Sequence, residues 1–128
     1  MSIDWVYFTE KEMQCRGTGE CNMDEKFMEK LIDLREDYNR PMIITSGYRS
    51  QAHNSAVGGS PNSAHVHGRA VDILVSGNEA YDILSLAFKH GFTGIGVAQR
   101  GANNKRFIHI DDMDDSDRSP RPTVWSYK

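Results

Sequence analysis

Three polar residues stand in surroundings that point to metal chemistry. His65 lies in a polar loop, and Asp72 follows within the apolar, β-branched run 70–75. His109 occupies the middle of a second apolar run, residues 107–111. Buried carboxylates are paired, hydrogen-bonded or metal-bound, because a bare one is costly to bury. Two imidazoles and one carboxylate that leave a fourth position open are typical of a catalytic zinc site.

Each of these residues also has an ordinary structural interpretation. A strand histidine is often a hydrogen-bonded core residue, and a strand aspartate is often paired with an arginine. The combination favours a metal site, because strand alternation puts His109 and Asp111 on one face. A non-haem iron site of two histidines and one carboxylate is excluded by chain order, since no histidine follows Asp111.

Two long helices are predicted from stripes of apolar residues at helical spacing. The first ends before Pro41, and the second covers residues 77–90 with Gly91 as its C-cap. Each begins with a predicted capping box, and the pairs are Asn22 with Glu25 and Ser76 with Glu79. A short helix of about two turns is expected over residues 50–57.

A buried strand is predicted over residues 42–46, and a second strand over residues 70–75. Residues 94–99 and 106–111 are predicted to form a hairpin. The polar tail that follows carries three apolar residues that we expect to dock back: Val124, Trp125 and Tyr127. These elements predict an α+β fold, in which helices pack on a small, mainly antiparallel sheet. The metal site is expected on a face of that sheet.

Length and composition limit the class of protein. The 128 residues are expected to form one domain, and 38% hydrophobic with 26% charged residues exclude a disordered chain. A net charge of -3 argues against nucleic-acid binding, and the apolar runs are too short to span a membrane. No secretory signal pattern opens the sequence, so cytoplasmic synthesis is expected. Cys15 and Cys21 are expected to remain reduced thiols.

Several motifs that follow one another in order mark this sequence. They are Ser46–Ser50 (SGYRS), residues 57–63, the pattern Ser63-x-His65-x-x-Gly68-x-Ala70-x-Asp72, residues 94–97, residues 107–111 and the closing Trp125–Tyr127. In this order they resemble the M15 peptidases, the zinc D-Ala-D-Ala carboxypeptidase family, over nearly the whole chain. They are most similar to its short phage and prophage branch. Relatives include endolysins that cut L-Ala-D-Glu bonds, and the metal fold is shared with hedgehog domains.

The resemblance implies roles for individual residues. It implies one Zn²⁺ per chain, held by His65, Asp72 and His109. It implies that Arg49 binds the scissile carbonyl, where a fixed cation in a water-poor cleft stabilises an oxyanion. The substrate-binding residues expected beside them are Tyr48, Ser63 and His67.

The sequence departs from the family pattern at the general base. Many members carry an acidic residue three positions before the last zinc ligand, and here that position is Arg106, which cannot accept a proton. The remaining candidates are Asp111, His67 and His53. Asp111 either accepts the proton or orients His109 from behind.

The implied function is metal-assisted hydrolysis of an amide bond in peptidoglycan stem peptides, by a D,D-carboxypeptidase or an endopeptidase. We expect a monomer that acts at the bacterial cell wall, in phage lysis, virion-borne entry or wall remodelling. Two alternatives remain at this point. One is a zinc-containing binding or structural module without catalysis, which Arg106 favours. The other is a metal-free phage structural protein.

Overall fold

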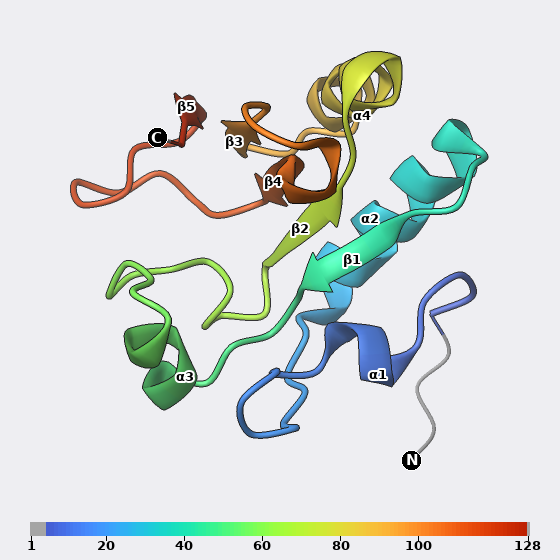
Figure 1. Ribbon diagram of the computed structural model, residues 1–128. Helices are drawn as coiled ribbons and strands as arrows, with labels where there is room; N and C mark the ends of the chain where they lie inside the picture. The colour runs from blue at the N-terminus through green and yellow to red at the C-terminus, as the bar shows by residue number, and fades with distance from the viewer. Residues whose placement is uncertain (1–4, 128) are drawn as a thin grey trace.

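The computed structural model describes residues 5–127 and is built on one five-stranded sheet (Figure 1). The elements in chain order are α1 (Glu10–Met13), α2 (Glu25–Tyr38), β1 (Ile43–Ser46), α3 (Gln51–Ala56), β2 (Ala70–Leu74), α4 (Gly77–Lys89), β3 (Gly94–Ala98), the 3-10 turn η1 (Asn103–Lys105), β4 (Phe107–Asp111) and β5 (Thr123–Ser126). This arrangement confirms the α+β prediction. Over the described residues, the helices are too short or too polar for any of them to cross a membrane.

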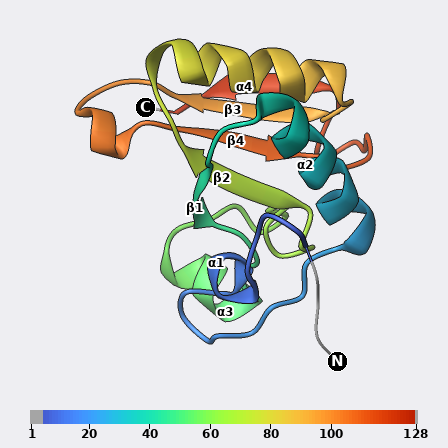
Figure 2. The ribbon, with the colours of Figure 1, turned by 90° about the vertical axis from the view of Figure 1, so that its right-hand side faces the viewer.

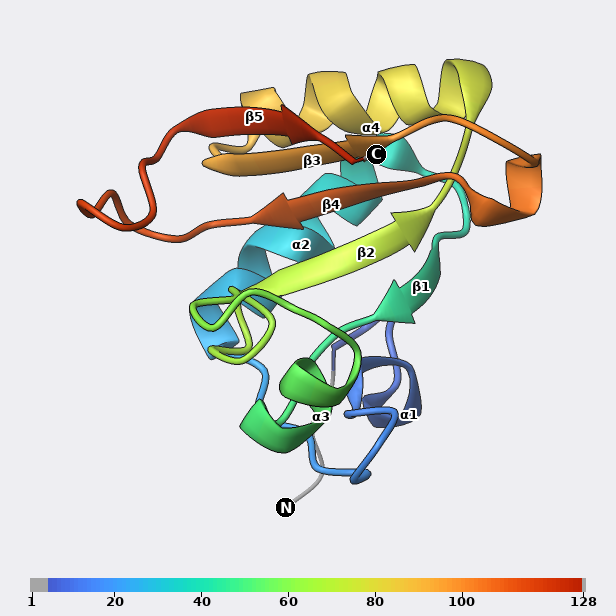
Figure 3. The same ribbon diagram turned by 60° about the vertical axis from the view of Figure 1, so that its left-hand side comes forward.

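The sheet has the strand order β1-β2-β4-β3-β5 (Figure 3). Three of its neighbouring pairs are antiparallel, and the predicted hairpin forms from β3 and β4. The tail docks back as predicted, because β5 pairs with β3, although in parallel orientation. The sheet is therefore mainly antiparallel, with one parallel pair at its edge.

The hydrophobic core lies between one face of the sheet and the helices α2 and α4 (Figure 2). Alternation along β2 and β4 turns four β-branched side chains toward these helices, each at most 1% exposed: Val71, Ile73, Ile108 and Ile110. The same alternation turns Asp72, His109 and Asp111 to the opposite face. The core packing therefore fixes which face of the sheet carries the polar residues.

The helix starts differ from the prediction in their capping bonds. Asp24, not Asn22, is the N-cap of α2, and its carboxylate accepts a hydrogen bond from the Phe27 amide at 2.9 Å. Ser76 is the N-cap of α4, but its side chain makes no capping bond. Glu79 instead accepts a hydrogen bond from the Tyr38 hydroxyl at 3.1 Å, which ties α4 to α2.

Two further elements differ from the prediction. The strand β1 lies at an edge of the sheet instead of inside it, and Ile43 is 58% exposed. The one-turn helix α1 was not predicted, although Thr9 and Glu12 form a reciprocal capping box at its start. Cys15 and Cys21 are free cysteines, as expected.

Candidate metal centre

Two of the expected metal ligands are direct neighbours in the sheet. Asp72 on β2 is paired in register with His109 on β4. The same row continues to Gly96 on β3 and to Ser46 on β1. Residues that are directly opposite in an antiparallel pair have their Cβ atoms about 5 Å apart. The register alone therefore brings the carboxylate and the imidazole together on the face away from the helices.

The third expected ligand, His65, comes from the loop between α3 and β2. Its Nδ1 lies 2.7 Å from the carbonyl oxygen of Gly47, and its own carbonyl accepts the Arg49 amide at 3.1 Å. The hydroxyl of Ser63 accepts the His65 amide at 3.3 Å. Gly68 ends the turn with φ +67°, a left-handed conformation that favours glycine. The SGYRS segment and this turn thus hold His65 over the sheet.

The three side chains meet around one carboxylate oxygen. Oδ1 of Asp72 lies 3.2 Å from Nε2 of His65 and 3.1 Å from Nδ1 of His109. The three ligand atoms all lie within 4.8 Å of one another, and all three residues are buried. Among residues 5–127, this is the only trio of histidine, cysteine or acidic side chains close enough to share an ion.

In each imidazole, the hydrogen-bond partner of the nitrogen that points away from Asp72 indicates whether the nitrogen that points toward Asp72 carries a hydrogen. A carbonyl oxygen can only accept, so Nδ1 of His65 carries the hydrogen and Nε2 turns a lone pair toward Asp72. Nε2 of His109 lies 2.8 Å from the Asp111 carboxylate, which accepts its hydrogen, so in the neutral form of the ring Nδ1 turns its lone pair toward the same oxygen. With both imidazoles neutral, three acceptor atoms face one another, and this arrangement suits a metal cation.

The donor set fits Zn²⁺. Zinc bonds of about 2.0–2.2 Å in tetrahedral geometry place neighbouring ligand atoms about 3.3 Å apart. The separations of 3.2 and 3.1 Å around Asp72 match this spacing. Three protein ligands also leave the fourth position that catalytic zinc sites keep open.

Burial and charge act on the three ligands in different directions. Burial lowers the pKa of His65 and outweighs the contact with Asp72, which favours the neutral, ligating form. Burial also opposes the charged form of His109, but the carboxylates of Asp111 and Asp72 outweigh it and raise that pKa. Burial works against the charged form of Asp72, yet the two imidazoles hold its pKa far below the usual range.

Asp111 stands behind His109 and is fully buried. Arg121 holds both of its oxygens, with Nε at 3.0 Å and a terminal nitrogen at 2.9 Å. The Met113 amide donates to it at 3.2 Å. Burial works against its charge, but His109 and Arg121 lower the pKa of Asp111 to about 2. A carboxylate with these partners is a weak base, so its surroundings favour the orienting role over the base role.

Arg49 lies on the other side of the ligand cluster. One terminal nitrogen is 3.5 Å from Oδ2 of Asp72, and the other donates to Oδ1 of Asn54 at 3.3 Å. Its Nε donates to the hydroxyl of Ser46 at 3.2 Å. Asn54 is 1% exposed and donates to the Ser60 carbonyl at 2.8 Å. The guanidinium is thus fixed beside the carboxylate by neutral acceptors.

These side chains line one cleft of about 510 Å³. The lining includes Arg49, Ser63, His65, Asp72, His109 and Asp111, together with Phe107, Arg118, Arg121, Trp125 and Tyr127. Six of the eight predicted site residues therefore meet here. Tyr48 lies outside the lining, and its amide instead bonds to the Met13 carbonyl at 2.8 Å. His67 is exposed and lines a smaller cavity of about 290 Å³ that adjoins the cleft through Asn62, Arg118 and Ser119.

Comparison with known proteins now adds to this geometry. The profile of a family described as Peptidase M15 matches residues 6–111 of the chain. The chain belongs to the M15 peptidase family. A relative is the Zinc D-Ala-D-Ala carboxypeptidase of Streptomyces albus G, which is 41% identical over 72 residues. That match covers 55% of this chain and 28% of the relative, so the chain corresponds to less than a third of that protein. The comparison and the ligand geometry together support Zn²⁺ as the cofactor.

Among the described residues that line the cleft of this M15 chain, every carboxylate already has an ion-pair or hydrogen-bond partner. The two present are Asp72 and Asp111, and both are bound as described above. Arg106, at the position where an acid is usual, donates to the Gly101 carbonyl at 3.0 Å and closes the hairpin loop. His53 lies on α3, and its ring packs against Gly17 away from the cleft.

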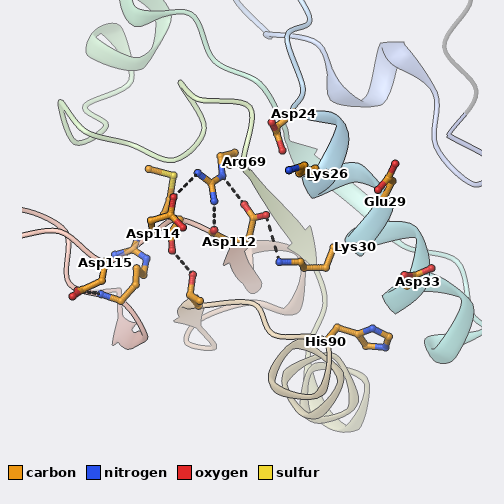
Figure 4. A pocket seen from close by; sticks show the side chains of 13 residues that line it. Asp24, Lys26, Glu29, Lys30, Asp33, Arg69, His90, Asp112, Asp114 and Asp115 are labelled. Atoms are coloured by element: carbon orange, nitrogen blue, oxygen red, sulfur yellow. Dashed lines mark hydrogen bonds and ion pairs between the residues drawn. The ribbon is translucent and has the colours of Figure 1, made fainter.

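A larger cavity of about 940 Å³ lies beside α2 and the segment after β4 (Figure 4). Its central charges neutralise one another, since Asp112 pairs with Arg69 at 2.8 Å and with Lys30 at 3.6 Å. Arg69 also reaches Asp114 at 3.5 Å. These contacts tie the segment after β4 to α2 and β2, which is a structural role.

The sequence interpretation missed one residue of this M15 site, Arg121. No local pattern singles it out, because its partner lies ten residues earlier at the end of β4. The available signal was indirect: a buried Asp111 needs a partner beyond His109. Trp125 and Tyr127 were expected to dock, but their place in the cleft depends on the register of β5 on β3.

Proposed function

We propose that the protein is a zinc-dependent peptidase that hydrolyses an amide bond in the stem peptides of bacterial peptidoglycan. The observation that carries this proposal is the buried trio of His65, Asp72 and His109 at the base of a cleft, with Arg49 3.5 Å from the central carboxylate. The name of the Streptomyces relative supports the substrate class.

When bound, Zn²⁺ supplies Lewis acidity that polarises the scissile carbonyl and promotes loss of a proton from water. Hydrolysis breaks the C–N bond, adds hydroxyl to the carbonyl carbon and leaves a hydrogen on the amine. Arg49 would hold the carbonyl oxygen as negative charge grows on it. Its guanidinium is held by Ser46 and Asn54, so little reorganisation is needed during the reaction.

Residues behind the ligands keep the imidazoles in their ligating tautomers. Gly47 accepts the outer hydrogen of His65, and Asp111 accepts that of His109. Outer partners of this kind fix ring orientation, and their loss typically costs about 10–100-fold in metal affinity or activity. We assign Asp111 to this positioning role, with Arg121 as its anchor.

The charge of the cleft supports a substrate with free carboxylates, as stem peptides have. Arg49 and Arg121 face the carboxylates Asp72 and Asp111 in it, so the exposed Arg118 supplies the excess positive charge. Both a D,D-carboxypeptidase and an endopeptidase fit this charge. The bacterial cell wall is the proposed place of action, in phage lysis, virion entry or remodelling. We propose a monomer as the working unit.

A second candidate is a zinc-containing binding module that does not cleave. The observation that favours it is the engagement of both cleft carboxylates, which leaves no free acidic base among the described residues that line the cleft. Such a module would bind the same stem peptides and retain its metal.

Product analysis by mass spectrometry tests both candidates. Purified peptidoglycan is incubated with the zinc-loaded protein, with a chelated sample and with a His65→Ala variant whose fold is checked by circular dichroism. We expect metal-dependent release of one defined fragment, and its mass names the bond. Retention of zinc without any fragment would support the binding module and overturn the peptidase.

A further inference from the structure

The strand β5 places two aromatic side chains beside the metal ligands. The row of Asp72 and His109 continues through Gly96 to Trp125. The ring centroids of Trp125 and His109 are 5.1 Å apart. Tyr127, two residues on, has its ring 5.0 Å from that of Phe107. The end of the described chain is therefore a wall of the cleft and not a loose tail.

Gly96 makes the close approach of both aromatic rings possible. A Cβ at this position would lie 2.7 Å from Nε1 of Trp125 and 2.7 Å from Cε2 of Tyr127. Real Cβ atoms do not come this close to other heavy atoms, so any larger residue would push the rings from the sheet. The glycine thus fixes the position of the phenol beside the ligand row.

The Tyr127 hydroxyl has its hydrogen-bonding capacity free. The rings of Trp125 and Tyr127 lie edge to face, with their centroids 6.4 Å apart. A phenol hydroxyl can both donate and accept a hydrogen bond. No acceptor for its hydrogen is found among the described residues, and Tyr127 is 37% exposed in the cleft. An incoming substrate oxygen is the natural acceptor.

Burial favours the protonated form of this phenol. Burial raises the pKa of Tyr127, the nearby Asp72 carboxylate raises it further, and Arg49 opposes them. Arg49 enters from the loop after β1, at one edge of the sheet, whereas Tyr127 follows β5 at the other edge (Figure 3). The two donors therefore flank the ligand cluster from opposite sides.

We infer that Tyr127 is a further catalytic residue, which donates its hydroxyl hydrogen to the carbonyl oxygen of the scissile amide opposite Arg49. This role rests on the proposed peptidase function. The contact strengthens as negative charge develops on that oxygen, so it acts on the turnover rate more than on substrate binding. Trp125 is a positioning residue, since its ring packs edge to face against that of Tyr127.

The test compares Tyr127→Phe with the wild type and with Tyr81→Phe as a matched control. Tyr81 is 72% exposed on α4, far from the cleft lining. With a stem peptide as substrate, we expect Tyr127→Phe to lower kcat by about 100-fold with little change in KM. Affinity for a phosphinate analogue of that peptide, measured by calorimetry, should fall to a similar extent. Zinc content and Tm should not change, and Tyr81→Phe should behave as wild type.

A second variant guards against a folding defect. Trp125→Phe keeps an aromatic ring but removes the larger indole against which Tyr127 packs, and weakening an edge-to-face contact of about 1 kcal/mol predicts roughly a fivefold lower kcat. Unchanged kcat and unchanged analogue affinity in Tyr127→Phe would overturn the role of Tyr127 alone. A zinc-loaded wild type that cleaves no stem peptide would instead refute the proposed function, and this role with it.

Discussion

Gly94 on β3 gives a direct test of how the second ligand histidine is held. A Cβ at Gly94 would lie under 3.0 Å from both oxygens and the Cγ of Asp111. That carboxylate cannot move aside, because Arg121, His109 and the Met113 amide all bind it. In an open strand position, Gly→Ala stabilises by about 0.5–1 kcal/mol. At Gly94 we expect the same substitution to destabilise the protein.

The loss of stability expected for Gly94→Ala has two contributions. Overpacking a filled site costs about 1–3 kcal/mol. Displacing Asp111 also weakens at least one charge-assisted hydrogen bond, at about 1.5–3 kcal/mol. We therefore expect Gly94→Ala to lower the free energy of unfolding by about 2.5–6 kcal/mol. Because His109 loses its outer partner, zinc affinity should fall by about 10–100-fold.

Urea unfolding and zinc titration with a competing chelator measure the two effects. The control is Gly91→Ala, since Gly91 has φ +76° and nothing within 4 Å of its added Cβ. It should cost about 1–2 kcal/mol of backbone strain and leave zinc affinity unchanged. If Gly94→Ala kept both the stability and the zinc affinity of the wild type, the account of Asp111 as a clamped support would be refuted.

Three further outcomes are expected. Zinc at a hundred times its dissociation constant should stabilise the wild type by about 2.7 kcal/mol over the chelated protein in urea unfolding, and His65→Ala should abolish the difference. Asp112→Asn should cost about 1–3 kcal/mol in the same assay, because it breaks the pairs with Arg69 and Lys30, while zinc content stays unchanged. Burial and the Glu79 contact raise the pKa of Tyr38, so its contribution to stability is full below pH of about 10 and is lost as the pH rises above that value. Thermal unfolding measured between about pH 9 and about pH 11 should therefore show a smaller loss of stability in Tyr38→Phe than in the wild type, and equal losses would contradict this role of Tyr38.

The ligand trio could be predicted because its residues break strong local patterns. Asp72 and His109 interrupt apolar, β-branched runs, and alternation assigns each to the face opposite the core residues. The loop histidine His65 completed a two-imidazole, one-carboxylate set, and the resemblance of the surrounding motifs then added Arg49. What local patterns cannot supply is register, so the direct pairing of Asp72 with His109 emerged only from the fold.

The remaining differences have physical causes of the same kind. Asn22 and Asp24 are both good N-caps, and local sequence does not decide between them. Glu79 sits where a capping box needs it, but Tyr38 from another helix offers a competing donor. Ile43 is apolar yet exposed, because its strand has no neighbour on one side. The partnership of Arg121 with Asp111 depends on the path of an irregular segment that no periodicity describes.

Zinc stoichiometry tests the central claim most directly. Metal content by mass spectrometry is measured after zinc loading and gel filtration for the wild type, Asp72→Asn and Asp112→Asn. Both substitutions remove one carboxylate charge from a buried aspartate, but only Asp72 belongs to the ligand trio. We predict one zinc per chain in the wild type and in Asp112→Asn, and loss of zinc in Asp72→Asn. A wild type without zinc, or an Asp72→Asn variant that retains it, would contradict the account.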